Sequence, residues 1–186
     1  MIQPATAPRL TVPINEHDHV LGPITASVTM VEYGDYECPH CGQAHHMVKQ
    51  LRQLMGHRMC LVFRHFPLTT VHPHAQQAAE AAEAAGVQGK FWEMHDVLFE
   101  HQYALEPSDL LQYAAALGLD VPRFSSELAR HIHAPRVREH FMSGVRSGVN
   151  GTPTFFINGM RHDGSYDLDT LVDAIEAAMG AVTGHR

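Results

Sequence analysis

The spacing of apolar residues divides this 186-residue chain into strand-like and helix-like segments. Residues 28–33, Val-Thr-Met-Val-Glu-Tyr, form a short run rich in β-forming residues, and residues 59–64, Met-Cys-Leu-Val-Phe-Arg, are almost entirely apolar. These runs predict two strands, the second of them buried on both faces. Residues 1–17 contain several prolines and no periodic pattern, so we expect an extended, poorly packed leader.

Between these two runs the apolar residues recur at helical intervals. The predicted helix begins at Pro39 and ends at Gly56, a residue typical of a left-handed helix cap. A strand, a helix and a second strand of this length form a βαβ unit, so the two strands should be parallel. The residues expected on the buried face of the helix are Val48, Leu51, Leu54 and Met55.

The central part of the chain has only helical patterns, and five helices are predicted there. Gly86 and Gly118 are expected to end the first and the third. Ser108 is expected to cap the third, and Pro122 and Pro135 to begin the last two. The apolar positions that define the five helices are the alanines of residues 75–85; Phe91, His95, Leu98 and Phe99; Leu110, Leu111, Ala114 and Leu117; Phe124, Leu128 and Ile132; and Val137, Phe141 and Val145.

Strand patterns return near the C-terminal end of the chain. Residues 154–157 and 160–162 flank the pair Asn158-Gly159, which supplies the positive φ angles of a two-residue hairpin turn. A last helix is predicted over residues 168–179. The order of these elements predicts an α/β domain that is split by helices inserted in its middle.

Composition and charge exclude several classes of function. The chain is 45% apolar and 18% charged, as in an ordinary globular protein. Acidic residues outnumber basic ones 20 to 13 and the basic residues do not cluster, so we expect no nucleic-acid partner. We expect no membrane insertion either, because no apolar run approaches the roughly 20 residues that span a bilayer. No signal-peptide pattern is visible, which predicts a cytoplasmic location, or a periplasmic one if a leader has been removed.

Cys38 and Cys41 form a Cys-x-x-Cys pair with three possible roles: a metal site, a redox couple, or two buried thiols. A structural zinc site usually needs four ligands. The remaining cysteine, Cys60, lies in an apolar strand and is expected to be a small core residue. His45 and His46 are adjacent, so their side chains project in different directions from a helix. No metal is therefore predicted at the pair.

The placement of Cys38 favours a redox couple. This residue lies at a junction of strand and helix, with Pro39 as the first helical residue, and the amides and dipole at a helix start favour a thiolate. Cys41 follows about one turn later on the same face, within reach of a disulfide. His40, between the cysteines, adds a group that can carry positive charge beside the thiolate.

Three separate motifs resemble the DsbA-like branch of the thioredoxin superfamily, the bacterial thiol–disulfide oxidoreductases with a helical insertion. Residues 38–41, Cys-Pro-His-Cys, match the active-site tetrapeptide of that family, and residues 151–157, Gly-Thr-Pro-Thr-Phe-Phe-Ile, match its cis-proline segment. Residues 91–99 resemble the start of its inserted helices. The resemblance covers about residues 17–180.

This resemblance implies a thioredoxin-like α/β fold with an inserted all-helical subdomain. Residues 18–67 and 135–182 would form the thioredoxin-like domain and residues 68–134 the insertion. Cys38 would be the exposed attacking thiolate, and Cys41 the buried resolving cysteine.

The resemblance also assigns roles to residues outside the cysteine pair. Thr152 and Pro153, joined by a cis bond, would face the disulfide and present their backbone to a substrate strand. The family member DsbA itself has an aliphatic residue before the proline, whereas the hydroxyl of Thr152 can hydrogen-bond the thiolate or the substrate. Glu32 matches a buried acid thought to assist proton transfer near the resolving cysteine, although its position also suits a solvated edge-strand glutamate. Arg64 is suggested as the charge partner of Glu32.

The expected activity is thiol–disulfide exchange with polypeptide substrates, with the Cys38–Cys41 dithiol as the only redox group and no further cofactor. The redox partner would be glutathione, a thioredoxin system or a membrane oxidase. One alternative is a chaperone, peptide-binding or metal-holding protein on the same fold. Another is a glutathione-dependent isomerase or transferase, although such relatives commonly carry serine in place of Cys38.

Overall fold

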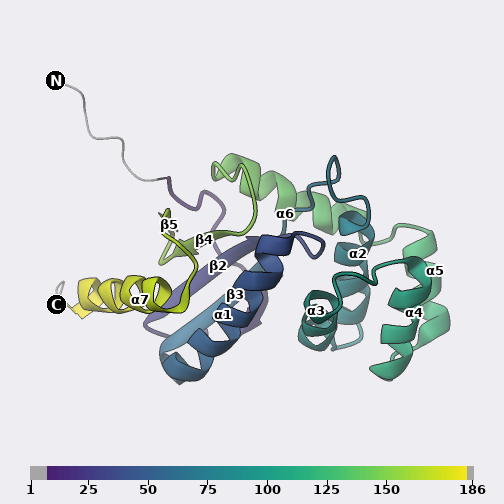
Figure 1. Ribbon diagram of the computed structural model, residues 1–186, viewed down its shortest axis with the longest axis horizontal. Coiled ribbons are helices and arrows are strands. Elements are labelled where there is room, and N and C mark those ends of the chain that lie inside the picture. Colours follow the sequence, from purple (N-terminus) through teal and green to yellow (C-terminus); the bar gives the residue numbers. More distant parts are fainter. Residues whose placement is uncertain (1–7, 184–186) are drawn as a thin grey trace.

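The computed structural model describes residues 8–183 of the chain. Its elements follow the βαβ, helical and ββα order expected from the sequence (Figure 1). In the first part of the chain they are β1 (His19–Leu21), β2 (Val28–Gly34), α1 (Pro39–Met55), the short 3-10 helix η1 (Gly56–Arg58) and β3 (Met59–His65). The remaining elements are α2 (Ala75–Gly86), α3 (Phe91–Glu100), α4 (Pro107–Ala116), α5 (Val121–Ala129), α6 (Ala134–Arg146), β4 (Thr154–Ile157), β5 (Met160–His162) and α7 (Leu168–Thr183).

The strands form one mixed sheet in the order β1-β3-β2-β4-β5. β2 and β3 are parallel, which confirms the predicted βαβ unit, and every residue of β3 is buried. β4 runs antiparallel to β2 and to β5, and Asn158 and Gly159 turn the chain between them with φ angles of 47° and 78°. The sequence pattern did not predict β1, because three residues are too few to show an alternation.

Helices cover both faces of the sheet. One core joins α1 and α7 to the face of β2, β3 and β4 that carries Met30, Leu61 and Phe155. The opposite face, with Val31 and Phe156, packs against residues that include Phe141 of α6. This three-layer arrangement with a mixed sheet is a thioredoxin-like α/β fold, as the resemblance implied.

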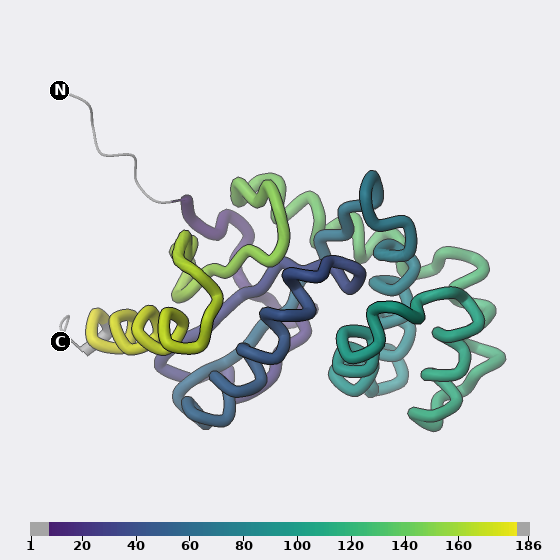
Figure 2. The backbone as a smooth tube through the Cα atoms, in the orientation of Figure 1, coloured from purple at the N-terminus to yellow at the C-terminus, as the bar shows by residue number. Residues whose placement is uncertain are grey.

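Helices α2 to α5 gather at the end of the molecule opposite α7 (Figures 1 and 2). Their apolar residues share one core with Tyr36, Cys38 and Cys41, so the inserted helices pack directly against the predicted redox pair. The exact limits of the insertion, residues 68–134, stay a prediction. None of the described helices is both long enough and apolar enough to cross a membrane.

Four predictions about individual helix positions were wrong. Leu54 is 57% exposed, because the face of α1 that packs on the sheet contains Leu51 and Met55 and excludes it. Ile132 is 45% exposed, since α5 has already ended and the chain has turned before reaching it. Val145 is 46% exposed on the outer face of α6. Ser108 lies inside α4, whose cap is Glu106 in a capping box with Asp109.

The described part of the leader is packed against the domain, contrary to the expectation for residues 1–17. The amide of Leu10 donates to the carbonyl of Gly159 at 2.9 Å. Leu10 and Ile14 pack against the core beneath α6, and the carbonyls of Val12 and Pro13 accept hydrogen bonds from Arg64. These buried contacts stabilise residues 10–14 in an extended conformation, although their sequence has no regular hydrophobic pattern. Residues 1–7 lie outside the described part of the chain.

Candidate active site

Cys38 is the N-cap of α1, and Pro39 is the first helical residue. The amide of Cys38 donates to the carbonyl of Asp35, and its own carbonyl accepts the first helical hydrogen bond, from Gly42. The side chain of Cys38 is therefore fixed at the point where the helix presents unpaired amides. It retains only 4% of its surface. The expectation of an exposed cysteine is wrong, because the thiol faces the Thr152 segment, with its sulfur 3.5 Å from the Thr152 carbonyl oxygen.

The surroundings of Cys38 favour its thiolate. Its pKa is lowered from 9.0 to about 5, chiefly by a hydrogen bond from the Cys41 thiol. The side chain of Thr152 and the backbone amides of Cys41 and His40 lower it further, against the opposing effect of burial. At neutral pH Cys38 is therefore ionised, and a thiolate is the form of cysteine that can act as a nucleophile.

Cys41 has the opposite character. It has no exposed surface, and burial raises the pKa of its thiol well above 9.0. The hydrogen bond with Cys38 and the negative charge of Glu32 raise it further. The amide of Asp35 donates weakly to the Cys41 sulfur at 3.5 Å. One low-pKa sulfur and one high-pKa sulfur are thus held on the same turn of α1.

Glu32 lies on β2, the central strand of the sheet, between Phe63 of β3 and Phe155 of β4. It is 2% exposed, and burial raises the pKa of its carboxyl to about 8. Its Oε1 atom has no hydrogen-bond partner in the described part of the chain. The alternative of a solvated edge-strand glutamate is therefore wrong, and a buried acid acts on the pKa of Cys41.

The suggestion that Arg64 pairs with Glu32 is wrong. Although both residues are buried on neighbouring strands, the guanidinium of Arg64 donates to both carboxylate oxygens of Asp18 at 2.8 Å. It also donates to the hydroxyl of Tyr33 at 3.0 Å. Alternation along the parallel strands explains this result, because Glu32 pairs in register with Phe63 and Arg64 points to the other face of the sheet.

The predicted loop of Thr152 and Pro153 lies beside Cys38, and the peptide bond between these two residues is cis. The Thr152 side chain lowers the pKa of Cys38. Its hydroxyl is buried and has no other hydrogen-bond partner among the described residues.

Pro39 and His40 are exposed at the start of α1. The Nδ1 atom of His40 lies 3.0 Å from the hydroxyl of Tyr166, which in turn donates to the Gln43 side chain. The backbone amide of His40 lowers the pKa of Cys38. Tuning of the thiolate by the imidazole itself stays a prediction. Cys60 is fully buried in β3, in the core position expected for it.

Two residues that the sequence analysis did not single out hold the active-site segment in place. The carboxylate of Asp35 is buried and accepts from the amides of Glu37 and Leu68 and from His72, each at 2.8 Å. Gln102, in the loop after α3, donates its side-chain amide to two carbonyls next to the redox pair, that of Tyr36 at 2.9 Å and that of Cys38 at 2.8 Å. Asp35 lies three residues before Cys38, so its nearness to the Cys-x-x-Cys motif could have identified it as an active-site residue. The sequence around Gln102 contains no motif that indicates such a role.

The fold and the Cys38–Cys41 site together indicate the protein family to which the chain belongs. The chain belongs to the thioredoxin family, whose model matches residues 14–177. The DsbA-like resemblance is supported by solved structures, which are similar in fold. BdbD from Bacillus subtilis has a TM-score of 0.83 at 22% identity, covering 94% of this chain and 98% of that one. A thioredoxin-like oxidoreductase from Silicibacter pomeroyi has a TM-score of 0.77 at 29% identity, covering 89% and 94%. Wolbachia pipientis α-DsbA1 is also similar, with a TM-score of 0.78 at 23% identity over 92% and 95%.

Curated relatives of higher identity carry a different name. The chain is 54% identical over 170 residues to the Na(+)/H(+) antiporter NhaA 1 of Salinispora arenicola, covering 91% of this chain and 26% of the antiporter. It is 45% identical over 163 residues to the antiporter NhaA of Herminiimonas arsenicoxydans, covering 88% and 26%. The chain thus spans about a quarter of the length of these relatives.

Proposed function

We propose that the protein catalyses thiol–disulfide exchange with polypeptide substrates through Cys38 and Cys41. The observation that carries this proposal is the difference between the two sulfurs, since the pKa of Cys38 is about 5 and that of Cys41 is raised well above 9.0. Thiol–disulfide exchange requires one cysteine that is ionised and attacks the substrate disulfide, and a second cysteine that stays protonated until it attacks the mixed disulfide. The name of the similar Silicibacter pomeroyi protein, a thioredoxin-like oxidoreductase, supports the same activity.

The exchange proceeds in two balanced steps. The Cys38 thiolate attacks one sulfur of a substrate disulfide, which forms a mixed disulfide and releases the other substrate sulfur as a thiolate. Cys41 then loses its proton, attacks the Cys38 sulfur and releases the second substrate thiolate. The protein is thereby oxidised to the Cys38–Cys41 disulfide while the substrate disulfide is reduced. The reverse sequence oxidises a substrate dithiol.

The test is an exchange assay combined with the reduction potential of the pair in glutathione buffers. Cys38→Ser should abolish exchange with a disulfide-bonded peptide, and Cys60→Ser is the matched control that should retain it. A potential near about −120 mV would indicate an oxidant suited to an oxidising compartment, and one near about −270 mV a reductant suited to the cytoplasm. If no disulfide forms at any potential, the proposal is wrong, and peptide binding without catalysis takes its place.

The antiporter relatives favour a second proposal, which concerns the partner. A segment similar to this chain makes up 26% of proteins named as sodium–proton antiporters. We propose that a membrane antiporter is among the polypeptides with which the Cys38–Cys41 pair exchanges disulfides. Cys41→Ser, which traps the mixed disulfide on Cys38, should form a covalent adduct with a purified antiporter that contains cysteine. Failure to form this adduct, while a model peptide is still trapped, would refute the partner and leave the activity intact.

A further inference from the structure

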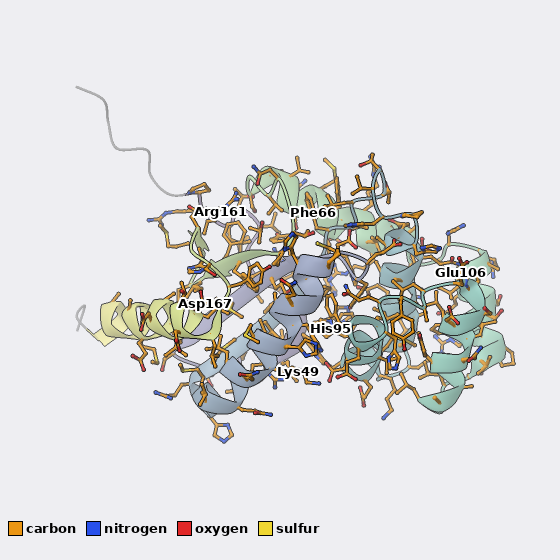
Figure 3. All side chains as sticks on the ribbon, in the orientation of Figure 1. Lys49, Phe66, His95, Glu106, Arg161 and Asp167 are labelled. Carbon is orange, nitrogen blue, oxygen red and sulfur yellow. The ribbon has the colours of Figure 1, made fainter. Side chains whose placement is uncertain are left out.

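A small cavity lies between α1, α3 and the sheet. Its lining includes four groups that can ligate a metal ion: Glu32 of β2, His45 of α1, and His95 and Asp96 of α3. Figure 3 shows His95 on α3 directed toward α1, with Lys49 of α1 nearby. None of these side chains takes part in the exchange steps above, and only Glu32 affects the pKa of a redox cysteine.

The distances in this group suit a shared ligand. His45, His95 and Asp96 each offer one ligand atom, and these three atoms all lie within 4.8 Å of one another. The Nε2 atom of His45 is buried without a hydrogen-bond partner and lies 3.6 Å from Oδ1 of Asp96. This distance is too long for a hydrogen bond. It is close to the separation of about 3.4 Å between two tetrahedral ligands of a zinc ion with bonds of about 2.0–2.1 Å.

The ring of His95 is oriented by a hydrogen bond on its other side. Its Nδ1 atom lies 3.0 Å from the hydroxyl of Tyr36, which leaves Nε2 as the ring nitrogen that can bind a metal. A hydrogen bond of this kind on the second ring nitrogen is typical of metal-bound histidines.

The charges around the cavity are compatible with a cation. Lys49 donates to Oδ2 of Asp96 at 3.2 Å and to Glu100 at 3.0 Å, so its charge faces two carboxylates, and Oδ1 of Asp96 remains available. The Arg52 side chain also lines the cavity. The carboxyl of Glu32 lines the same cavity, and its Oε1 atom has no hydrogen-bond partner in the described part of the chain.

We propose that His45, His95 and Asp96 bind one divalent transition-metal ion, with Zn²⁺ the best match. Two imidazoles and a carboxylate are ligands that suit zinc. This site does not use the cysteines, so it differs from the metal site at the cysteine pair that the sequence analysis considered and did not predict. A second cluster, His19, His65 and Glu83, carries no such proposal, because both histidines already bond to Glu83 at 2.9 and 2.8 Å.

The test uses Zn²⁺ and Co²⁺ titrations of a Cys38→Ser, Cys41→Ser protein without a histidine tag, so that active-site thiols and a tag cannot bind the ion. Calorimetry should give one tight equivalent of Zn²⁺, and Co²⁺ should give visible absorption without a thiolate charge-transfer band. Asp96→Asn and His45→Ala should weaken binding at least tenfold. His46→Ala, on the exposed neighbouring position, and Glu100→Gln, on the other carboxylate that Lys49 contacts, are matched controls that should bind normally.

The proposal is overturned if no equivalent binds with a dissociation constant below the millimolar range, or if Asp96→Asn leaves binding unchanged. Asp96 is half-exposed and its replacement keeps the side-chain volume, so this variant should fold even if His45→Ala does not. Circular dichroism of each variant checks the fold. The outcome is independent of exchange activity, because the titrated protein lacks both redox cysteines.

Discussion

Arg64 contacts Asp18 through two parallel hydrogen bonds of 2.8 Å, which are almost completely shielded from solvent. This bidentate ion pair connects the segment before β1 to strand β3 of the sheet. Arg64 is engaged by Asp18 on the face of α6, and no charge interaction offsets the burial of the Glu32 carboxyl. The pKa of Glu32 is raised for this reason, through burial without a compensating charge.

Replacing Asp18 by Asn should destabilise the protein by about 3–5 kcal/mol, because the guanidinium of Arg64 would remain buried without its counter-charge. Urea unfolding of the reduced protein measures this change. Asp163→Asn is the matched control, since Asp163 pairs with Arg161 at 2.9 Å but is 65% exposed. An exposed pair contributes only about 0–1 kcal/mol. Equal effects of the two substitutions would contradict a structural role for the Arg64–Asp18 pair.

Glu32 should make stability depend on pH. Its carboxyl ionises at about 8 in the folded protein, against 4.5 ordinarily, so the folded state binds one more proton between these values. The free energy of unfolding should therefore fall as pH rises through this window, by about 1.4 kcal/mol per pH unit. Below the window both states are protonated, and above it both are ionised, so the contribution is then constant.

Glu32→Gln removes this titration. The difference in unfolding free energy between the variant and the original protein should shift in favour of the variant as pH rises from about 5 to 8. Urea denaturation of both proteins, in the reduced state and at several pH values, measures the difference. Parallel curves for the two proteins would mean that Glu32 does not titrate in this range.

Cys38 should react with iodoacetamide with a rate that titrates near pH 5, since its pKa is lowered to about this value. Cys41→Ala removes the hydrogen bond that contributes most to this shift. The midpoint should then rise by about one to two units, because a hydrogen bond to a charged group contributes about 1.5–3 kcal/mol. Cys60→Ala changes a distant buried thiol and should leave the midpoint unchanged. A midpoint near pH 9 in the unaltered protein would contradict the ionised nucleophile.

The sequence predicted those parts of the molecule that depend on local periodicity or on a contiguous motif. The parallel pair β2 and β3, the helices and the Asn158-Gly159 hairpin follow from spacing, and the positions of Cys38 and Cys41 follow from the start of α1. Contacts between distant segments could not be read in this way. Arg64 finds its partner 46 residues away, in a segment without regular structure.

The metal-binding cluster in the cavity between α1 and α3 could not be predicted from the sequence for the same reason. In the sequence, His95 served only to mark the helical pattern of α3, together with Phe91 and Leu98. His45 was considered only together with its neighbour His46. The structure brings His45 and His95 together across two helices. Only the packing of α3 against α1 creates this juxtaposition, and neither helix alone carries a signal for it.

Gln102→Ala should impair the active site without removing a reacting group. The substitution leaves the carbonyls of Tyr36 and Cys38 without their side-chain donor, which should destabilise the protein by about 1–3 kcal/mol. It should also slow exchange and shift the pH midpoint for alkylation of Cys38, because that carbonyl begins helix α1. Stopped-flow alkylation across a pH series measures the shift.

Gln88→Ala provides the matched control for Gln102→Ala. Gln88 also bonds to backbone groups, the carbonyl and amide of Asp120, but within the inserted helices and away from the cysteines. It should cause a similar loss of stability with no change in the midpoint for Cys38. If Gln102→Ala behaved in the same way as Gln88→Ala, Gln102 would only support the fold. A shift confined to Gln102→Ala would establish that the inserted helices position the nucleophile through this amide.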